Sequence, residues 1–141
     1  VDIILATPSA DGKYSGIVES RFLAGAVLAF GDLVYLQTAD SRWELANADN
    51  ATAGYNLKLG ICVLAAAGDG SATKVLLYGD VNAATAFPAL TIGAPVYMAV
   101  TAGDVQVAAP TGTTDIVRIV GYANTADELH FCPDNTQLKL V

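Results

Sequence analysis

One short pattern occurs twice in the chain, as GDLVYL at residues 31–36 and as GAPVYM at residues 93–98. In both copies a glycine precedes a run of aliphatic and aromatic residues, which is typical of a strand that follows a turn. A second glycine follows each copy at nearly the same distance, Gly60 in the first half and Gly121 in the second. Because the spacing agrees as well as the residues, the sequence predicts one domain of two similar β lobes. Two copies are too few for a solenoid, which needs about three repeats.

Short strands are predicted along the whole repeat region, because runs of Val, Ile, Leu, Tyr and Thr alternate with turn residues such as Asp-Gly. The expected strands are residues 33–38, 43–46, 59–65, 74–80, 94–100, 105–108, 115–123 and 128–132. Alanine-rich residues 23–30 and 64–67 have helix propensity, but no helical period continues through them. We therefore expect an all-β fold, a β-sandwich or β-barrel-like single domain, with repeat halves at about residues 23–80 and 86–135.

The first 18 residues lie outside the repeat. Apolar residues 3–5 are followed by a polar, turn-rich stretch at residues 7–13. We interpret residues 1–18 either as an N-terminal arm that clamps a neighbouring chain or as the first strand of the β domain formed by residues 19–141. The opening residues lack the basic start and the long apolar stretch of a signal peptide.

The composition excludes several classes of protein. The 141 residues include 7 Lys and Arg against 14 Asp and Glu, a formal net charge of −7, and 53% of them are hydrophobic. The chain is too apolar for a disordered protein, and too acidic to bind nucleic acid or an anionic membrane surface directly. Only 15% of the residues are charged, against about 25% in a typical soluble domain. We therefore expect part of the surface to be buried against another chain.

Few residues offer catalytic or metal-binding chemistry. The chain has one histidine, His130, and two cysteines, Cys62 and Cys132. In a strand, His130 and Cys132 point to the same face. A zinc site needs about four ligands, however, and a nucleophile and its base usually come from separate elements. We expect no catalytic residue, no metal and no cofactor, and a small enzyme is an alternative only through His130 and Cys132. Cys62 is expected to be a buried free thiol, with a disulfide to Cys132 as the alternative.

The aromatic residues have two interpretations. Tyr35 and Tyr97 occupy equivalent positions of the repeat, and we expect a symmetric pair inside the core. The alternative is an exposed aromatic platform for a sugar, for which Trp43, between Arg42 and Glu44, is the best single candidate. We favour a Trp43 that covers one edge of the core.

Short motifs of common residue types follow one another in a characteristic order over roughly residues 20–141. In the first half they lie at residues 25–36, 43–48, 59–61 and 74–79, and in the second half at residues 90–97, 101–103, 109–112, 116–123 and 131–134. This order resembles a β-rich module of tailed-bacteriophage structural proteins, which occurs in capsid decoration (cement) proteins and in head or tail fibres. Cys132 departs from the pattern of that family.

The resemblance implies a virion protein with no catalytic residues to carry over. It implies a decoration protein, commonly a homotrimer, that binds the major capsid protein on the outer surface of the capsid and stabilises the head. Such a protein is made in the cytoplasm of the host bacterium. We expect the arm residues Val1, Ile3, Ile4 and Leu5 to contact the capsid. The alternative is a fibre or tail module that binds host-surface carbohydrate through Trp43 and the tyrosines.

Overall fold

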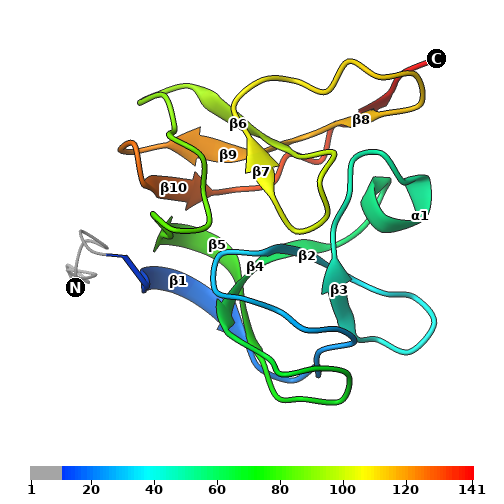
Figure 1. The fold of residues 1–141 in the computed structure, drawn as a ribbon, viewed down its shortest axis with the longest axis vertical. Helices are drawn as coiled ribbons and strands as arrows, with labels where there is room; N and C mark the ends of the chain where they lie inside the picture. The colour runs from blue at the N-terminus through cyan, green and yellow to red at the C-terminus, as the bar shows by residue number, and fades with distance from the viewer. Residues whose placement is uncertain (1–10) are drawn as a thin grey trace.

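The computed structural model describes residues 11–141, and strands dominate its regular structure (Figure 1). Strands account for 39% of the described residues and helix for 3%, so the expected all-β single domain is confirmed. In chain order the elements are β1 (Lys13–Glu19), β2 (Leu33–Leu36), β3 (Trp43–Leu45), α1 (Ala51–Gly54), β4 (Leu59–Leu64), β5 (Lys74–Asn82), β6 (Pro95–Met98), β7 (Val105–Gln106), β8 (Ile116–Val117), β9 (Ile119–Ala123), β10 (Glu128–Phe131) and β11 (Leu138–Lys139). Within residues 11–141 no helix has the length and apolar character needed to cross a membrane.

Nine strands form one antiparallel sheet that curls into a half-barrel. Its order is β3-β2-β4-β5-β10-β9-β6-β7, and β1 pairs with β5 off this path. The order reads the same from both ends when β2 is matched with β6, β3 with β7, β4 with β9 and β5 with β10. In Figure 1, β1 to β5 form the lower lobe and β6 to β10 the upper lobe. The two halves of the sequence therefore form two lobes that meet where β5 pairs with β10.

The two copies of the short pattern occupy matching places in the sheet. In each lobe the valine of the pattern lies opposite the second glycine, in the pairs Val34–Gly60 and Val96–Gly121. The glycines that open the copies, Gly31 and Gly93, have φ angles of 94° and 76°. Glycine adopts this left-handed conformation at little cost, which explains why a glycine begins both copies.

Strand β5 joins both lobes to the N-terminal strand. One of its edges pairs with β1, and the other is shared between β4 at residues 74–76 and β10 at residues 79–82. Gly16 of β1 lies opposite Gly79 of β5, with φ angles of 142° and 140°. A Cβ atom on either residue would lie 2.1 Å from a carbonyl oxygen of the other strand, so this close approach requires glycine at both positions.

Buried side chains form two clusters on opposite faces of the first lobe, because side chains alternate along a strand. The main core is shared by both lobes and includes Leu33, Tyr35, Ile61, Leu76, Val81, Val96, Met98, Leu129 and Phe131. The outer core lies on the other face of β2, β3 and β4 and consists of Ala24, Leu28, Val34, Trp43, Cys62, Ala66 and Val75. The loops at residues 22–28 and 65–73 cover this second face through the isolated bridges Ala24–Trp43 and Leu28–Ala66. The part of the first lobe formed by β2, β3 and β4 is thus covered on both faces.

Every predicted strand range overlaps an observed strand, although the range 115–123 divides at Arg118 into β8 and β9. The alanine-rich residues 23–30 form no helix, as expected, and instead lie across the outer core. Strand β1 makes the residues from Lys13 onward part of the sheet. The short helix α1 and strand β11 were not predicted.

Candidate interaction surface

Trp43 lies in the outer core, with none of its surface exposed. The backbone N–H of Trp43 donates to the carbonyl of Leu23 at 3.0 Å, and the N–H of Gly25 donates to the carbonyl of Trp43 at 2.9 Å. The Lys58 ammonium lies 5.5 Å from the centroid of the ring. No face of the ring is open to a sugar, so the alternative interpretation of Trp43 as a sugar contact is wrong, and the favoured interpretation, a Trp43 that packs in the core, is confirmed. The indole packs between the sheet and its covering loop instead.

Tyr35 and Tyr97 do not form the expected pair inside the core. Tyr35 belongs to the main core, with 8% of its surface exposed. Tyr97 is half-buried on the opposite face of β6, because its neighbours Val96 and Met98 point into the main core. Equivalent tyrosines of the repeat therefore serve different faces of the sheet.

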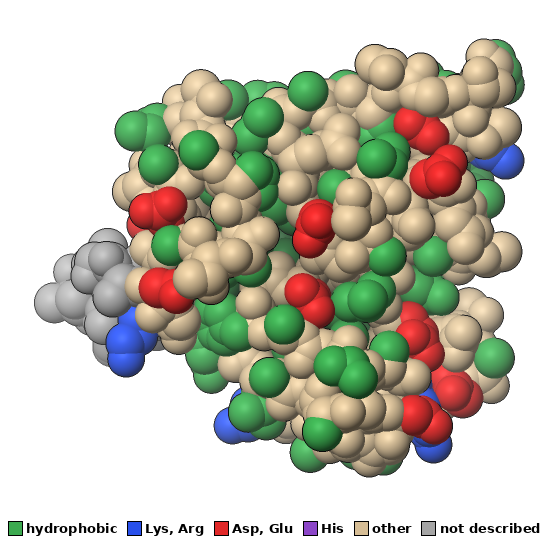
Figure 2. Space-filling view, viewed as in Figure 1, with side chains coloured by type: hydrophobic (Ala, Val, Ile, Leu, Met, Phe, Trp, Pro, Cys, Tyr) green, Lys and Arg blue, Asp and Glu red, His purple; other side chains and the backbone are tan. Residues whose placement is uncertain are grey.

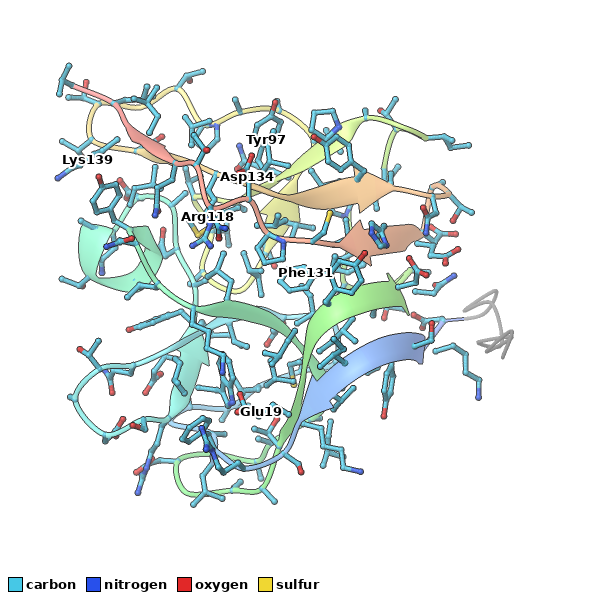
Figure 3. The ribbon with its side chains drawn as sticks, turned by 180° about the vertical axis from the view of Figure 1, so that it is seen from behind. Glu19, Tyr97, Arg118, Phe131, Asp134 and Lys139 are labelled. Carbon is cyan, nitrogen blue, oxygen red and sulfur yellow. The ribbon has the colours of Figure 1, made fainter. Side chains whose placement is uncertain are left out.

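A second sheet face carries large side chains without a covering loop among the described residues. Directly opposed residues of antiparallel strands share a face. The pairs Ile17–Tyr78, Asp80–His130 and His130–Tyr122 therefore place these five residues on the outer face of β1, β5, β10 and β9. These strands lie side by side in Figure 3. Ile17 is 62% exposed, Tyr78 51% and Tyr122 45%. We call these five residues the open outer face.

The polar groups of the open outer face bond to one another. The Nδ1 atom of His130 lies 2.8 Å from Oδ1 of Asp80, and the amide of Asn124 donates to the same oxygen at 3.0 Å. The Tyr78 ring packs edge-on against His130, with ring centroids 5.3 Å apart. Asn124 also donates to Glu128 at 3.4 Å, and burial raises the pKa of that carboxyl. Because these polar groups already have hydrogen-bond partners within the chain, an interface could cover them without breaking those bonds.

The cysteines give no support to the small-enzyme alternative. Burial, followed by the charges of Asp134 and Asp80, raises the pKa of the Cys132 thiol. Activation of a thiol nucleophile requires the opposite shift. Cys62 is a buried free thiol, as expected, and burial raises its pKa too. In the part of the chain that the structure describes, no three His, Cys, Asp or Glu side chains are grouped closely enough to hold a metal ion.

A cavity of about 270 Å³ lies between β6, β9 and the C-terminal segment. Its walls are Tyr97, Val117, Ile119, Asp134, Thr136, Gln137 and Leu138. Nearby, Arg118 is buried and donates to the carbonyls of Asp134 at 2.9 Å and Leu57 at 2.7 Å (Figure 3). Burial lowers the pKa of Arg118, and the charge of Asp134 opposes that shift. Arg118 thereby fixes the segment that forms one wall of the cavity.

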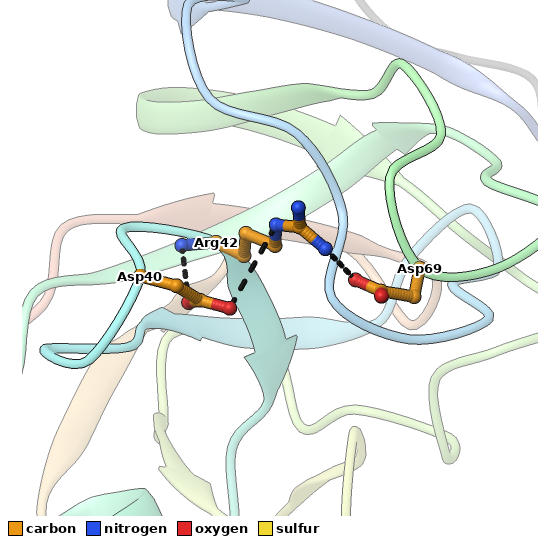
Figure 4. A network of polar contacts seen from close by, with 3 residues as sticks. All are labelled: Asp40, Arg42 and Asp69. Atoms are coloured by element: carbon orange, nitrogen blue, oxygen red, sulfur yellow. Dashed lines mark hydrogen bonds and ion pairs between the residues drawn. The ribbon is translucent and has the colours of Figure 1, made fainter.

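An ion-pair network holds the covering loops of the first lobe. Arg42 donates to Asp69 and pairs with Asp40 at 3.7 Å (Figure 4). The hydrogen bond and charge of Asp69 raise the pKa of Arg42. This network joins the turn before β3 to the turn before β5, so Arg42, which precedes Trp43, ties the covering loop at residues 65–73 to β3.

Acidic side chains are scattered over the face seen in Figure 2, with few basic ones among them. The formal net charge of −7 disfavours an acidic partner surface. A partner is therefore expected to be neutral or basic where it meets this molecule.

Of the predicted contact residues, Val1, Ile3, Ile4 and Leu5 lie outside the described residues. Sequence reasoning found His130 but missed the surface around it. Because side chains alternate along a strand, the sequence of residues 74–80 and 115–123 indicates that Tyr78 and Tyr122 lie on the face opposite to their buried neighbours. Only the register of β5, β10 and β9 shows that the two tyrosines share a face with His130.

No protein-family model, curated protein or solved structure matches the chain.

Proposed function

We propose that the protein is a structural component of a tailed-phage virion, which binds the outside of the capsid as a decoration protein and stabilises the head. The observation that carries the proposal is the open outer face, where Ile17, Tyr78 and Tyr122 expose large side chains on a sheet. Exposed apolar patches mark sites of protein contact, and tyrosine is enriched in such contacts. The order of motifs along the chain, which resembles decoration proteins, supports the same role.

A decoration protein acts by contact area and by number of copies. A stable interface buries about 1,600 Å² in total, and copies on a lattice reinforce one another. Here both lobes share the main core and are joined through β5, so the sheet meets a partner as one body. Because a rigid surface loses little conformational freedom on binding, more of the contact energy stabilises the shell.

The charge of the molecule supports a place outside the shell. A net charge of −7 is repelled by packaged DNA, whereas an outer position brings no such repulsion. The proposed partner is the major capsid protein. The arm residues Val1, Ile3, Ile4 and Leu5 remain part of the proposal as a second capsid contact.

Binding to phage heads tests the proposal. Purified protein is mixed with DNA-free heads of the tailed phage that encodes it, the heads are pelleted, and the bound fraction is measured. Tyr122→Lys places a charge on the open outer face and should weaken binding by about tenfold or more. Ile92→Lys is the matched control, since Ile92 is 72% exposed and lies outside that face. No binding to heads, or equal binding by both variants, would contradict the proposal.

A carbohydrate-binding fibre or tail module is the second candidate, and one observation favours it. Tyr78 and Tyr122 are exposed beside Asp80, Asn124 and His130, and aromatic rings with polar neighbours suit the faces and hydroxyls of sugars. A glycan array would report this activity. The signal should disappear in both Tyr78→Ala and Tyr122→Ala, and a signal that both variants retain would exclude this face.

A further inference from the structure

Strand β1 forms a rim of the sheet. It pairs with β5 from Lys13 to Glu19, and no strand within residues 11–141 pairs with its other edge. Figure 1 shows β1 as the outermost strand of the lower lobe. The unpaired edge of a strand presents a row of N–H and C=O groups, which is a template for another strand.

The other rims of this sheet are covered or short. The edge of β3 is occupied by residues 23–25, since the N–H of Trp43 donates to Leu23 and the N–H of Gly25 donates to Trp43. Strand β7, at the opposite end of the sheet, has two residues. The long β1 edge is therefore where a further strand has most backbone to pair with.

Strand β1 lacks most of the features that protect an edge from pairing. It contains no proline, and its charged residues stand only at its two ends, Lys13 and Glu19. The ladder with β5 has one irregularity, where Ile17 pairs with Tyr78 and Val18 pairs with Leu76. The extra residue belongs to β5, so β1 itself runs without a bulge.

The basic residues of this acidic chain gather around β1. Four of the seven Lys and Arg lie in or beside it, namely Lys13, Arg21, Lys58 and Lys74. Arg21 and Lys58 approach the Glu19 carboxylate at 3.6 and 2.7 Å. Two molecules with a charge of −7 repel each other over most of their surfaces. The β1 rim is the side on which two copies meet with least repulsion.

We propose that two copies of this chain pair through β1, antiparallel about a two-fold axis at Gly16, so that the sheet continues from one copy to the other. In this register Tyr14 lies opposite Val18 of the second copy, and Lys13 lies opposite Glu19. The first pair is apolar and the second has opposite charges, and antiparallel sheets favour both kinds of pair. Glycine on the axis leaves room where the copies meet. The pairing does not rest on the proposed function, and it replaces the homotrimer that the resemblance implies.

The mass in solution tests the association. Light scattering over a dilution series should give twice the chain mass of 14.5 kDa at high concentration. Ile17→Lys places two like charges near each other and near Lys13 of the opposite copy, and should weaken association by about tenfold or more. Ile92→Lys is the control, and thermal unfolding confirms that both variants fold. A single-chain mass throughout, a three-chain mass, or an unchanged Ile17→Lys dimer would overturn the pairing.

Cross-linking tests the register independently. In a Cys132→Ser background, Ser15→Cys and Ile17→Cys chains are mixed and mildly oxidised, while Cys62 stays buried. Directly opposed residues lie about 4.5–5.5 Å apart between Cα atoms, within disulfide range, whereas diagonal pairs lie about 7–8 Å apart. The mixture should cross-link several times faster than either variant alone. Equal rates, or no cross-link in a two-chain species, would overturn the register. Neither measurement uses a capsid, so failure here is distinguishable from failure of the proposed function.

Discussion

The two lobes contain the same pattern of strands but treat their outer faces differently. In the first lobe, Val34, Trp43 and Cys62 point outward and are covered by loops of the same chain. In the second lobe Tyr122 points outward and stays exposed, as do Ile17 and Tyr78 on the neighbouring strands β1 and β5 of the first lobe. Tyr97 of the second lobe lines an open cavity. A β lobe of this kind therefore presents an apolar outer face. Where a loop covers this apolar outer face, the side chains form a core. Where no loop covers it, the side chains form a surface that another molecule can bind.

Removing one large aromatic side chain from each outer face should have the largest effect. Trp43→Ala empties a fully buried site and should lower the free energy of unfolding by about 3–5 kcal/mol. Tyr122→Ala removes a side chain that is 45% exposed and should cost about 1 kcal/mol or less. Urea unfolding followed by tryptophan fluorescence, and by circular dichroism for the Trp43 variant, measures both values. Similar costs for the two variants would mean that the outer faces do not differ.

The next largest effect concerns the strand that joins the lobes. In Gly79→Ala, the new Cβ would meet the Ser15 carbonyl oxygen at 2.1 Å with φ at 140°, so β1 and β5 must move apart. We expect a loss of about 2–3 kcal/mol in the free energy of unfolding. Gly68→Ala is the matched control, because nothing lies within 4 Å of its Cβ position and it should be nearly neutral. A neutral Gly79→Ala would show that the close approach of β1 and β5 is dispensable.

The strands were predictable from local sequence, and the difference between the lobes was not. Runs of β-branched and aromatic residues between turn residues located the strands, because that signal depends only on neighbours in the chain. The fate of Trp43 depends on residues 22–28 folding back over β3, a contact that no local pattern encodes. The equivalent Tyr35 and Tyr97 looked symmetric, yet each strand turned a different side to the main core. Faces and registers are set by long-range pairing, and so the open outer face appears only in three dimensions.

The accessibility of the two cysteine thiols can be compared between the lobes in the unmodified protein. Cys62 lies under the cover of the first lobe, and Cys132 is partly exposed in the second. Iodoacetamide should label Cys132 about a hundredfold or more faster than Cys62, because Cys62 reacts only when its cover opens. Both thiols have raised pKa values through burial, so labelling of Cys132 at neutral pH should be slow and should rise steeply in alkaline solution. Equal labelling rates, read by mass spectrometry of peptides, would contradict a closed cover.

The smallest expected effect belongs to a carboxyl beside the open outer face. Burial raises the pKa of Glu128 above its ordinary value of 4.5, so the ionised form is disfavoured in the folded protein. A group of this kind stabilises the fold fully below pH 4.5, and its contribution falls as the pH rises through the raised value. Glu128→Gln should therefore be more stable than the unmodified protein at pH 7, by about 1 kcal/mol or less because the hydrogen bond from Asn124 offsets part of the cost of burial. The advantage should vanish below the ordinary pKa, and urea unfolding at a series of pH values measures it. If Glu128→Gln were instead less stable than the unmodified protein at pH 7, and this loss of stability shrank as the pH fell, the ionised carboxylate of Glu128 would stabilise the fold. That result would contradict the prediction.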